Sequence, residues 1–360
     1  MKTYAIREIP EVRLSGRFDR EQEGFPMMWT GACATMRVRG SALEARIACD
    51  YTVYNPYLSF EVDGLRAQFF APLKGAHWYS VFLGMDANTE HEVRITLETQ
   101  AFSADPLSQA TLLSLRTDGV FGELPAPKLK LEFVGDSVTS GEGMRGPTSF
   151  MEWVPMMFSA SSNYARYAAE LLHADYQVVS QSGWGIVSSW DNNPAFNLPA
   201  VYDYVCRPVA LDGQPNRGGE KPYDFAFKPD WVIIGLGAND QSASGHEPWI
   251  DPKTGEAFKQ DLSAESRKRF EDAYVAFLHQ VQRANPQARI LCMYDEQPDS
   301  AYHDLVVHAV ARAAKDGVPA RYVQLDDPSR LRNALGSREH PGEGIHRMMA
   351  RVLAREIRHA

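Results

Sequence analysis

Ser137 and His340 are the two residues whose chemistry most directly suggests a reaction. Ser137 follows a short, mostly apolar segment at 129–134, with glycines at positions 135 and 141. His340 precedes Pro341, so its backbone is expected to be extended and not helical. A serine hydroxyl that is deprotonated by a histidine is a common nucleophile for acyl transfer. Taken alone, Ser137 is equally compatible with an ordinary turn, so the pair needs further support.

Two other segments could donate hydrogen bonds to the oxyanion that forms during acyl transfer. Gly183 follows an apolar segment at 176–179, and a glycine allows a ligand to approach the backbone N–H closely. Asn239 follows an apolar segment at 231–236 and could direct its amide group inward. Each could instead belong to a plain turn. Because ligand sites in parallel sheets form at the carboxyl ends of the strands, we expect Gly183, Asn239 and Ser137 to lie together.

The elements that must position these residues alternate between strand and helix. Five short apolar segments are predicted strands: 129–134, 176–179, 231–236, 290–294 and 322–325. Helical patterns lie between them, one capped by Ser161 or Ser162, another by Ser263, and the last at about 344–358. This alternation predicts a parallel sheet with helices on both faces.

The first part of the chain has a different pattern. Polar and apolar residues alternate with period two in five segments: 34–39, 43–48, 58–62, 91–97 and 111–116. Several short strands at even spacing predict a sandwich or jelly roll. We therefore predict an all-β accessory domain at residues 1–122, a proline-containing linker at 123–127 and a catalytic α/β domain at 128–360.

Composition narrows the classes of partner. The net charge of −9 and the lack of basic runs argue against nucleic acid. No apolar run is long enough to span a membrane, and residues 1–10 lack the apolar core of a signal peptide. We expect a soluble, cytoplasmic protein, or a secreted or periplasmic one if a leader has been removed. His340 and His346 lack the spacing of a helical metal site, so we expect no metal and no cofactor. The oligomeric state is not predicted.

The order of these segments resembles that of the SGNH (GDSL-like) hydrolases. Gly135-Asp136-Ser137, Gly183, Gly237-Ala238-Asn239-Asp240 and His340-Pro341 occur in the order of the four blocks of that family, across about residues 127–360. The β domain, through Gly16-Arg17-Phe18 and Trp29-Thr30-Gly31-Ala32, resembles the N-terminal jelly roll of carbohydrate esterase family 2. The resemblance implies a flavodoxin-like domain with a parallel five-stranded sheet. It also implies removal of acetyl groups from plant polysaccharides of the xylan or mannan type.

The resemblance assigns a role to each block. Ser137 would attack the ester carbonyl, and His340 would take up its proton and pass it to the leaving alcohol. The backbone N–H groups of Ser137 and Gly183 and the amide of Asn239 would form the oxyanion hole. The family usually has an aspartate three residues before the histidine, where this chain has Ser337. The resemblance to carbohydrate esterase family 2 favours a Ser–His dyad oriented by a backbone carbonyl. A carboxylate from another loop, such as Asp295 or Glu296, is an open alternative.

The substrate is indicated less specifically. A long segment at 184–223, poor in secondary-structure signals, contains Trp184 and Trp190. We expect Trp184, Trp190 and Asp136 to contact an acetylated carbohydrate, although the aromatic residues could simply pack the loop. Two alternatives are open: an esterase, thioesterase or lipase acting on another acyl ester, and a non-catalytic carbohydrate-binding protein.

Overall fold

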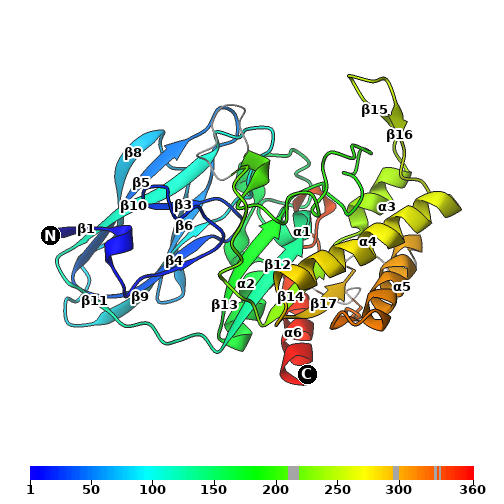
Figure 1. Ribbon diagram of the computed structural model, residues 1–360. Coiled ribbons are helices and arrows are strands. Elements are labelled where there is room, and N and C mark those ends of the chain that lie inside the picture. Colours follow the sequence, from blue (N-terminus) through cyan, green and yellow to red (C-terminus); the bar gives the residue numbers. More distant parts are fainter. Residues whose placement is uncertain (210–218, 295–299, 328–330, 332–333) are drawn as a thin grey trace.

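The computed structural model describes residues 1–209, 219–294, 300–327, 331 and 334–360. Figure 1 shows an all-β part formed by the first third of the chain beside an α/β part formed by the rest. The last strand of the β part ends at Gly122, and the first strand of the parallel sheet begins at Leu129. Among the described residues, no helix is both long enough and apolar enough to cross a membrane.

The β part is a sandwich of two antiparallel sheets. One sheet has the order β1-β10-β5-β8, with β3 also on β10: Lys2–Ala5, Gln109–Thr117, Ala42–Asp50, Gly75–Leu83 and Phe25–Met27. The other has the order β11-β4-β9-β6-β7, with β2 also on β4: Val120–Gly122, Cys33–Arg39, Glu90–Leu97, Leu58–Val62, Leu65–Phe70 and Arg13–Ser15. A 3-10 turn, Ile6–Glu8, joins β1 to β2. The inner faces pack together through alternating residues such as Ile47, Leu112 and Phe60. The predicted all-β sandwich is therefore confirmed.

The α/β part is built on a parallel sheet of order β13-β12-β14-β17-β18. These strands are Ala174–Ser180, Leu129–Gly135, Trp231–Gly235, Arg289–Met293 and Ala320–Tyr322. In chain order this is the 2-1-3-4-5 arrangement of flavodoxin-like folds, which confirms the predicted fold class. Gly135 is in register with both Ser180 and Gly235, so three neighbouring strands end at the same level.

Helices cover both faces of this sheet. On one face, α2 (Tyr164–Leu172) and α6 (Glu343–Arg358) pack on Phe133 and Ile233. On the other, α4 (Ala264–Ala284) and α5 (Ala301–Lys315) pack on Val134 and Ile234. Because consecutive strand residues point to opposite faces, the apolar runs of these strands serve both layers.

Helix caps test the predicted helix starts. Ser263 accepts a hydrogen bond from the Ser266 N–H and caps α4, as predicted. The cap of α2 is Asn163 and not Ser161 or Ser162, which lie in a preceding 3-10 turn, Ala160–Ser162. Asn163 accepts from the Arg166 N–H. The prediction therefore placed this helix start one or two residues too early.

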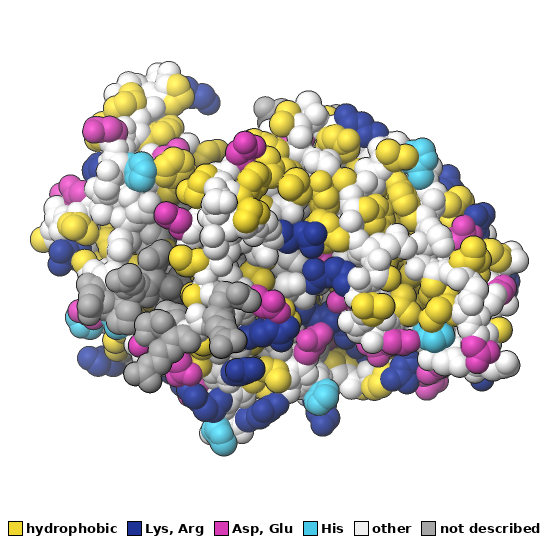
Figure 2. Space-filling view, turned by 180° about the vertical axis from the view of Figure 1, so that it is seen from behind, with side chains coloured by type: hydrophobic (Ala, Val, Ile, Leu, Met, Phe, Trp, Pro, Cys, Tyr) yellow, Lys and Arg dark blue, Asp and Glu magenta, His cyan; other side chains and the backbone are white. Residues whose placement is uncertain are grey.

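Short helices, 3-10 turns and one hairpin complete the described structure. Helix α1 is Ser137–Ser140 and helix α3 is Ala238–Ser244. The other 3-10 turns of the described residues are Pro155–Met157, Arg207–Val209 and Ser337–Glu339. After α3, the hairpin of β15 (Trp249–Ile250) and β16 (Ala257–Phe258) stands out from the body of the molecule in both views (Figures 1 and 2).

Candidate active site

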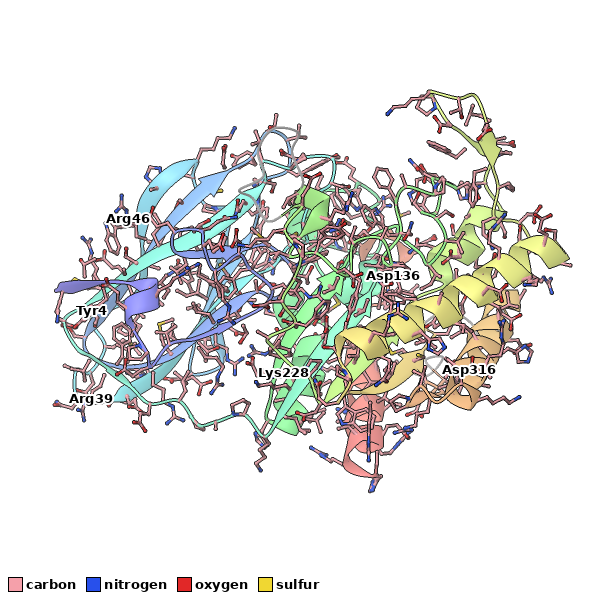
Figure 3. The ribbon with its side chains drawn as sticks, viewed as in Figure 1. Tyr4, Arg39, Arg46, Asp136, Lys228 and Asp316 are labelled. Atoms are coloured by element: carbon pink, nitrogen blue, oxygen red, sulfur yellow. The ribbon has the colours of Figure 1, made fainter. Side chains whose placement is uncertain are left out.

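Ser137 lies at the carboxyl end of β12, where it is the first residue of α1. Its side chain is partly exposed, whereas the three residues that follow are buried. The preceding residue, Asp136, caps the helix by accepting a hydrogen bond from the Val138 N–H at 3.1 Å. Asp136 is labelled in Figure 3 beside the end of the central strands. Because a first-turn N–H has no acceptor within its own helix, the Ser137 N–H is available to a ligand.

Gly183 and Asn239 lie beside this segment. The Asn239 amide donates to Asp136 Oδ2 at 3.2 Å and to the Trp184 carbonyl at 3.1 Å. It therefore bridges the segment of Ser137 and the segment of Gly183. Gly183 has a φ of +80°, and a Cβ there would lie 2.7 Å from the Trp190 ring, so a side chain is excluded on two counts.

Asp240 ties the glycine segment to helix α3. Its buried carboxylate accepts hydrogen bonds from the N–H groups of Ile186 and Val187, both at 2.8 Å. Burial raises the pKa of Asp240 to about 7, against the opposing effect of these hydrogen bonds. In the sequence, Asp240 stands out only as part of the Gly237–Asp240 block, so this anchoring was not predicted.

His340 reaches the site from the loop before α6. A Cβ on Gly143 would lie 2.6 Å from the His340 Cβ, so the histidine packs directly on this glycine. The same segment joins Ser137, because the Glu142 N–H donates to the Ser137 carbonyl at 3.0 Å. The side chain of His340 is 22% exposed. The structure thus brings all four predicted residues, Ser137, Gly183, Asn239 and His340, to one edge of the sheet.

The group that orients His340 is a backbone carbonyl. The Nδ1 atom lies 3.0 Å from the Arg338 carbonyl oxygen. An N–H at Nδ1 that donates to this oxygen leaves the lone pair on Nε2, which is the form that a general base needs. Ser337 is buried and its hydroxyl donates to the Arg145 carbonyl at 2.9 Å instead of contacting the imidazole. Asp295 and Glu296, the alternative carboxylates, lie outside the described residues.

A buried carboxylate beside His340 was missed in the sequence. Glu142 is 3% exposed at its side chain, and its Oε1 lies 3.7 Å from His340 Nε2 and 3.0 Å from Arg338 Nε. Glu142 therefore lies beside the Nε2 atom of the imidazole and also pairs with the residue whose carbonyl faces Nδ1. Arg338 has a φ of 56° and Glu339 a φ of 60°, which non-glycine residues rarely adopt. An acidic residue between two glycines soon after Ser137 was the available signal.

His346 belongs to the core. Its Nδ1 accepts a hydrogen bond from the Tyr164 N–H at 3.0 Å, and burial lowers its pKa to about 3. The imidazole is therefore neutral at physiological pH. Within the described ranges, no group of three or more His, Cys, Asp or Glu residues is arranged to hold a metal ion.

The three predicted substrate contacts lie in different surroundings. Trp190 is 47% exposed, and its ring meets His246 edge-on at 4.8 Å between centroids. Trp184 is 6% exposed and stacks on Phe196 at 5.1 Å. Asp136 is 1% exposed, and its two oxygens accept from Val138 and Asn239. Trp190 therefore has surface available to a ligand, whereas Trp184 and Asp136 have little.

Known proteins share this sequence and this fold. The family model described as GDSL-like Lipase/Acylhydrolase family matches residues 133–348. An acetylxylan esterase / glucomannan deacetylase of Cellvibrio japonicus is 28% identical over 236 residues, covering 64% of this chain and 59% of that protein. The cellulase/esterase CelE of Acetivibrio thermocellus is 24% identical over 334 residues, covering 86% of this chain and 37% of that protein. The chain thus spans less than two-thirds of the length of these curated relatives.

Solved structures extend the similarity over the whole chain. An acetyl xylan esterase (Est2A) from the rumen bacterium Butyrivibrio proteoclasticus superposes with a TM-score of 0.95 at 29% identity, covering 100% of this chain and 99% of that one. A family two carbohydrate esterase from Clostridium thermocellum, in complex with cellohexaose, has a TM-score of 0.79 at 22% identity, covering 97% and 98%. The second similarity is one of fold alone.

Proposed function

The chain belongs to the GDSL-like lipase/acylhydrolase family, and from this premise we propose that it is a serine esterase that removes O-acetyl groups from a xylan- or mannan-type carbohydrate. The observation that carries the proposal is the position of Asn239, whose amide bridges the segments of Ser137 and Gly183. That bridge supports an oxyanion hole in which the N–H groups of Ser137 and Gly183 and the Asn239 amide act together beside the Ser137 hydroxyl. Est2A and the curated Cellvibrio relative are named as acetylxylan esterases, which supports acetylated carbohydrate as the substrate.

The first half of the reaction forms an acetyl-enzyme. The Ser137 hydroxyl attacks the acetyl carbonyl while His340 Nε2 takes up its proton. The negative charge on the carbonyl oxygen is stabilised by the N–H groups of Ser137 and Gly183 and by the Asn239 amide. Because both amide hydrogens of Asn239 already have acceptors, the oxyanion must replace one of them, either Asp136 Oδ2 or the Trp184 carbonyl. Collapse of the tetrahedral intermediate transfers the proton from His340 to the sugar oxygen and releases the alcohol.

The second half regenerates the serine. A water molecule attacks the acetyl-enzyme, with His340 Nε2 now accepting the proton of water. The same three donors stabilise the second oxyanion. Collapse returns the proton to Ser137 and releases acetic acid, so one ester and one water give one alcohol and one acid. In the proposed dyad, the Arg338 carbonyl orients the imidazole throughout both halves.

Trp190 is the residue we propose for contact with the sugar. Its exposed ring lies directly against Gly183, and the backbone N–H of Trp190 donates to the Gly183 carbonyl at 2.8 Å. An aromatic face next to the oxyanion hole suits the apolar face of a sugar ring adjoining the acetyl group. The aromatic ring of Trp184, by contrast, contributes to packing of the same loop.

The test is release of acetate from p-nitrophenyl acetate and from acetylated xylan by the wild type and by Ser137→Ala. We expect the variant to lose about 10³-fold or more of the activity, as when a catalytic serine is removed from other serine hydrolases. Longer p-nitrophenyl esters and an acyl thioester, assayed in parallel, measure the preference for acetyl esters. Equal rates for wild type and variant would contradict the proposal, and a preference for long acyl chains would contradict its substrate.

A further inference from the structure

Gln100, a residue of the β part, reaches the catalytic edge of the neighbouring sheet. It lies in the connection between β9 and β10 and is 5% exposed. Its Oε1 accepts hydrogen bonds from the Ser182 N–H at 2.7 Å and from the Ser140 hydroxyl at 3.1 Å. Since the Ser182 N–H can only donate, the atom facing it must be the oxygen of the amide.

These two contacts join the two backbone segments that form the oxyanion hole. Ser182 immediately precedes Gly183, and Ser140 is the last residue of the short helix that begins at Ser137. The two segments follow different strands, β13 and β12, and each provides one backbone donor of the proposed hole. One oxygen that accepts from both segments restrains the separation of the donors.

We propose that Gln100 is a positioning residue, through which the β part holds the two backbone donors of the oxyanion hole at their working separation. The inference rests on the proposed function and adds to it a residue from outside the α/β part. Displacement of a catalytic group by about 1 Å can reduce a rate about 100-fold, so such a restraint has a measurable effect.

The surrounding contacts show that this part of the interface is buried and specific. The Ser140 hydroxyl also lies 2.9 Å from the Ser180 hydroxyl, at the end of β13. Glu98, two residues before Gln100, accepts from the Ser159 hydroxyl at 3.1 Å and from the Ser161 N–H at 3.0 Å. The connection between β9 and β10 thus contacts the α/β part at several points, but Gln100 joins the segments of Ser137 and Gly183.

Gln181 provides a matched control, because it precedes Ser182 and bonds to Ala101, the residue after Gln100. Gln181, 1% exposed, donates from its side-chain amide to the Ala101 carbonyl at 2.8 Å. This hydrogen bond joins the same two stretches of chain as the bond between Gln100 and Ser182. The bond from Gln181 does not involve Ser140, whereas Gln100 also accepts from the Ser140 hydroxyl. Gln100→Met and Gln181→Met therefore each remove one buried amide of similar size from one interface.

The experiment compares these two full-length variants with the wild type using p-nitrophenyl acetate and an arylboronic acid, which forms a tetrahedral adduct with an active serine. For Gln100→Met we expect kcat to fall roughly 10- to 100-fold, KM to change less than about threefold, and the boronate Ki to rise in parallel with the loss of kcat/KM. For Gln181→Met we expect a similar fall in Tm with kcat within about threefold of the wild type. Gln100→Asn, which withdraws the oxygen by one methylene, gives the same readouts if Gln100→Met fails to fold.

Two results would overturn the inference. One is a kcat for both Gln100 variants within about threefold of the wild type. The other is an equal loss of kcat in Gln181→Met, which would show a general effect of loosening the interface. A wild type with no Ser137-dependent activity would instead refute the proposed function, and the Ser137→Ala comparison separates that failure from these two.

Discussion

The oxyanion side and the histidine side of the site are built in different ways. The proposed oxyanion side, formed by Ser137, Gly183 and Asn239, follows the level ends of three adjacent parallel strands. The histidine side, residues 335–341, is a loop containing a 3-10 turn and an isolated bridge between Leu335 and Pro341. Strand register therefore positions the oxyanion side, whereas backbone strain and side-chain pairing position the histidine side.

The two sides also differ in their anchors. Asp240 and Gln100 hold the oxyanion side through hydrogen bonds to backbone N–H groups. The histidine side is fastened to Gly143, whose carbonyl accepts from the Ser337 N–H at 2.8 Å, and to Glu142 through Arg338. Substitutions on the oxyanion side should therefore change transition-state stabilisation directly, while those on the histidine side should act through the position of one imidazole.

The largest expected effect is on the oxyanion side. Asn239→Ala removes the amide donor, and loss of one oxyanion donor typically costs about 10²- to 10³-fold in kcat. KM should change little, because the donor acts on charge that develops after binding. Steady-state kinetics with p-nitrophenyl acetate measure both constants. A fall in kcat of less than about threefold would remove Asn239 from the oxyanion hole and weaken the contrast between the two sides.

An intermediate effect is expected on the stability of the core that adjoins the histidine side. His346 joins the start of α6 to α2, and its pKa is lowered to about 3 by burial, below the ordinary value of about 6.5. The unfolded chain therefore binds a proton that the folded chain does not, and the stabilisation present above pH 6.5 is lost as the pH falls toward 3. This single group should reduce the free energy of unfolding by about 1.4 kcal/mol per pH unit across that range.

The matched variant for this prediction is His346→Asn, whose side-chain oxygen can accept from the Tyr164 N–H but does not titrate in this range. Urea unfolding at pH 7, 6, 5 and 4 measures the slope for both proteins. The variant should be less stable at pH 7 and show a shallower loss toward pH 4. Parallel slopes would exclude His346 as the source of acid sensitivity in this part of the core.

The smallest expected effect tests the dyad. Asp295→Asn and Glu296→Gln remove the two carboxylates left open by the sequence, both outside the described residues. If the Arg338 carbonyl orients His340, each variant should keep kcat within about threefold of the wild type. Removal of a true triad aspartate costs about 10⁴-fold. A loss of that size in either variant would show that its carboxylate is the third member of a triad, and would contradict the dyad.

The sequence predicts the fold well because the fold depends on local patterns, and it also locates the residues of the proposed oxyanion hole at strand ends. Apolar segments at 129–134 and 231–236 predicted β12 and β14, and Ser137, Gly183 and Asn239 follow strand ends in the structure as the sequence predicts. Strand β8 was missed because it carries mostly exposed or half-exposed residues and lacks a buried alternation. The start of α2 was misplaced because three polar residues in a row could each cap a helix.

The remaining site residues could not be predicted because they depend on tertiary contacts. Gln100 contacts the site only because the β part packs against the end of β13. The role of Glu142 depends on the return of residues 335–341 to a point just after α1. The carbonyl of Arg338 faces the imidazole because Arg338 itself has a positive φ. The sequence does not predict that conformation, since non-glycine residues rarely adopt it.

The use of a main-chain oxygen beside His340 makes this partner resistant to single-residue replacement. Every amino acid provides a carbonyl, so replacing Arg338 leaves the acceptor in place and can only redirect it. The acceptor also has no ionisable proton, so acid that would neutralise an aspartate leaves it unchanged. Selection for robustness at this position would therefore act on the shape of the loop and not on the identity of an acid.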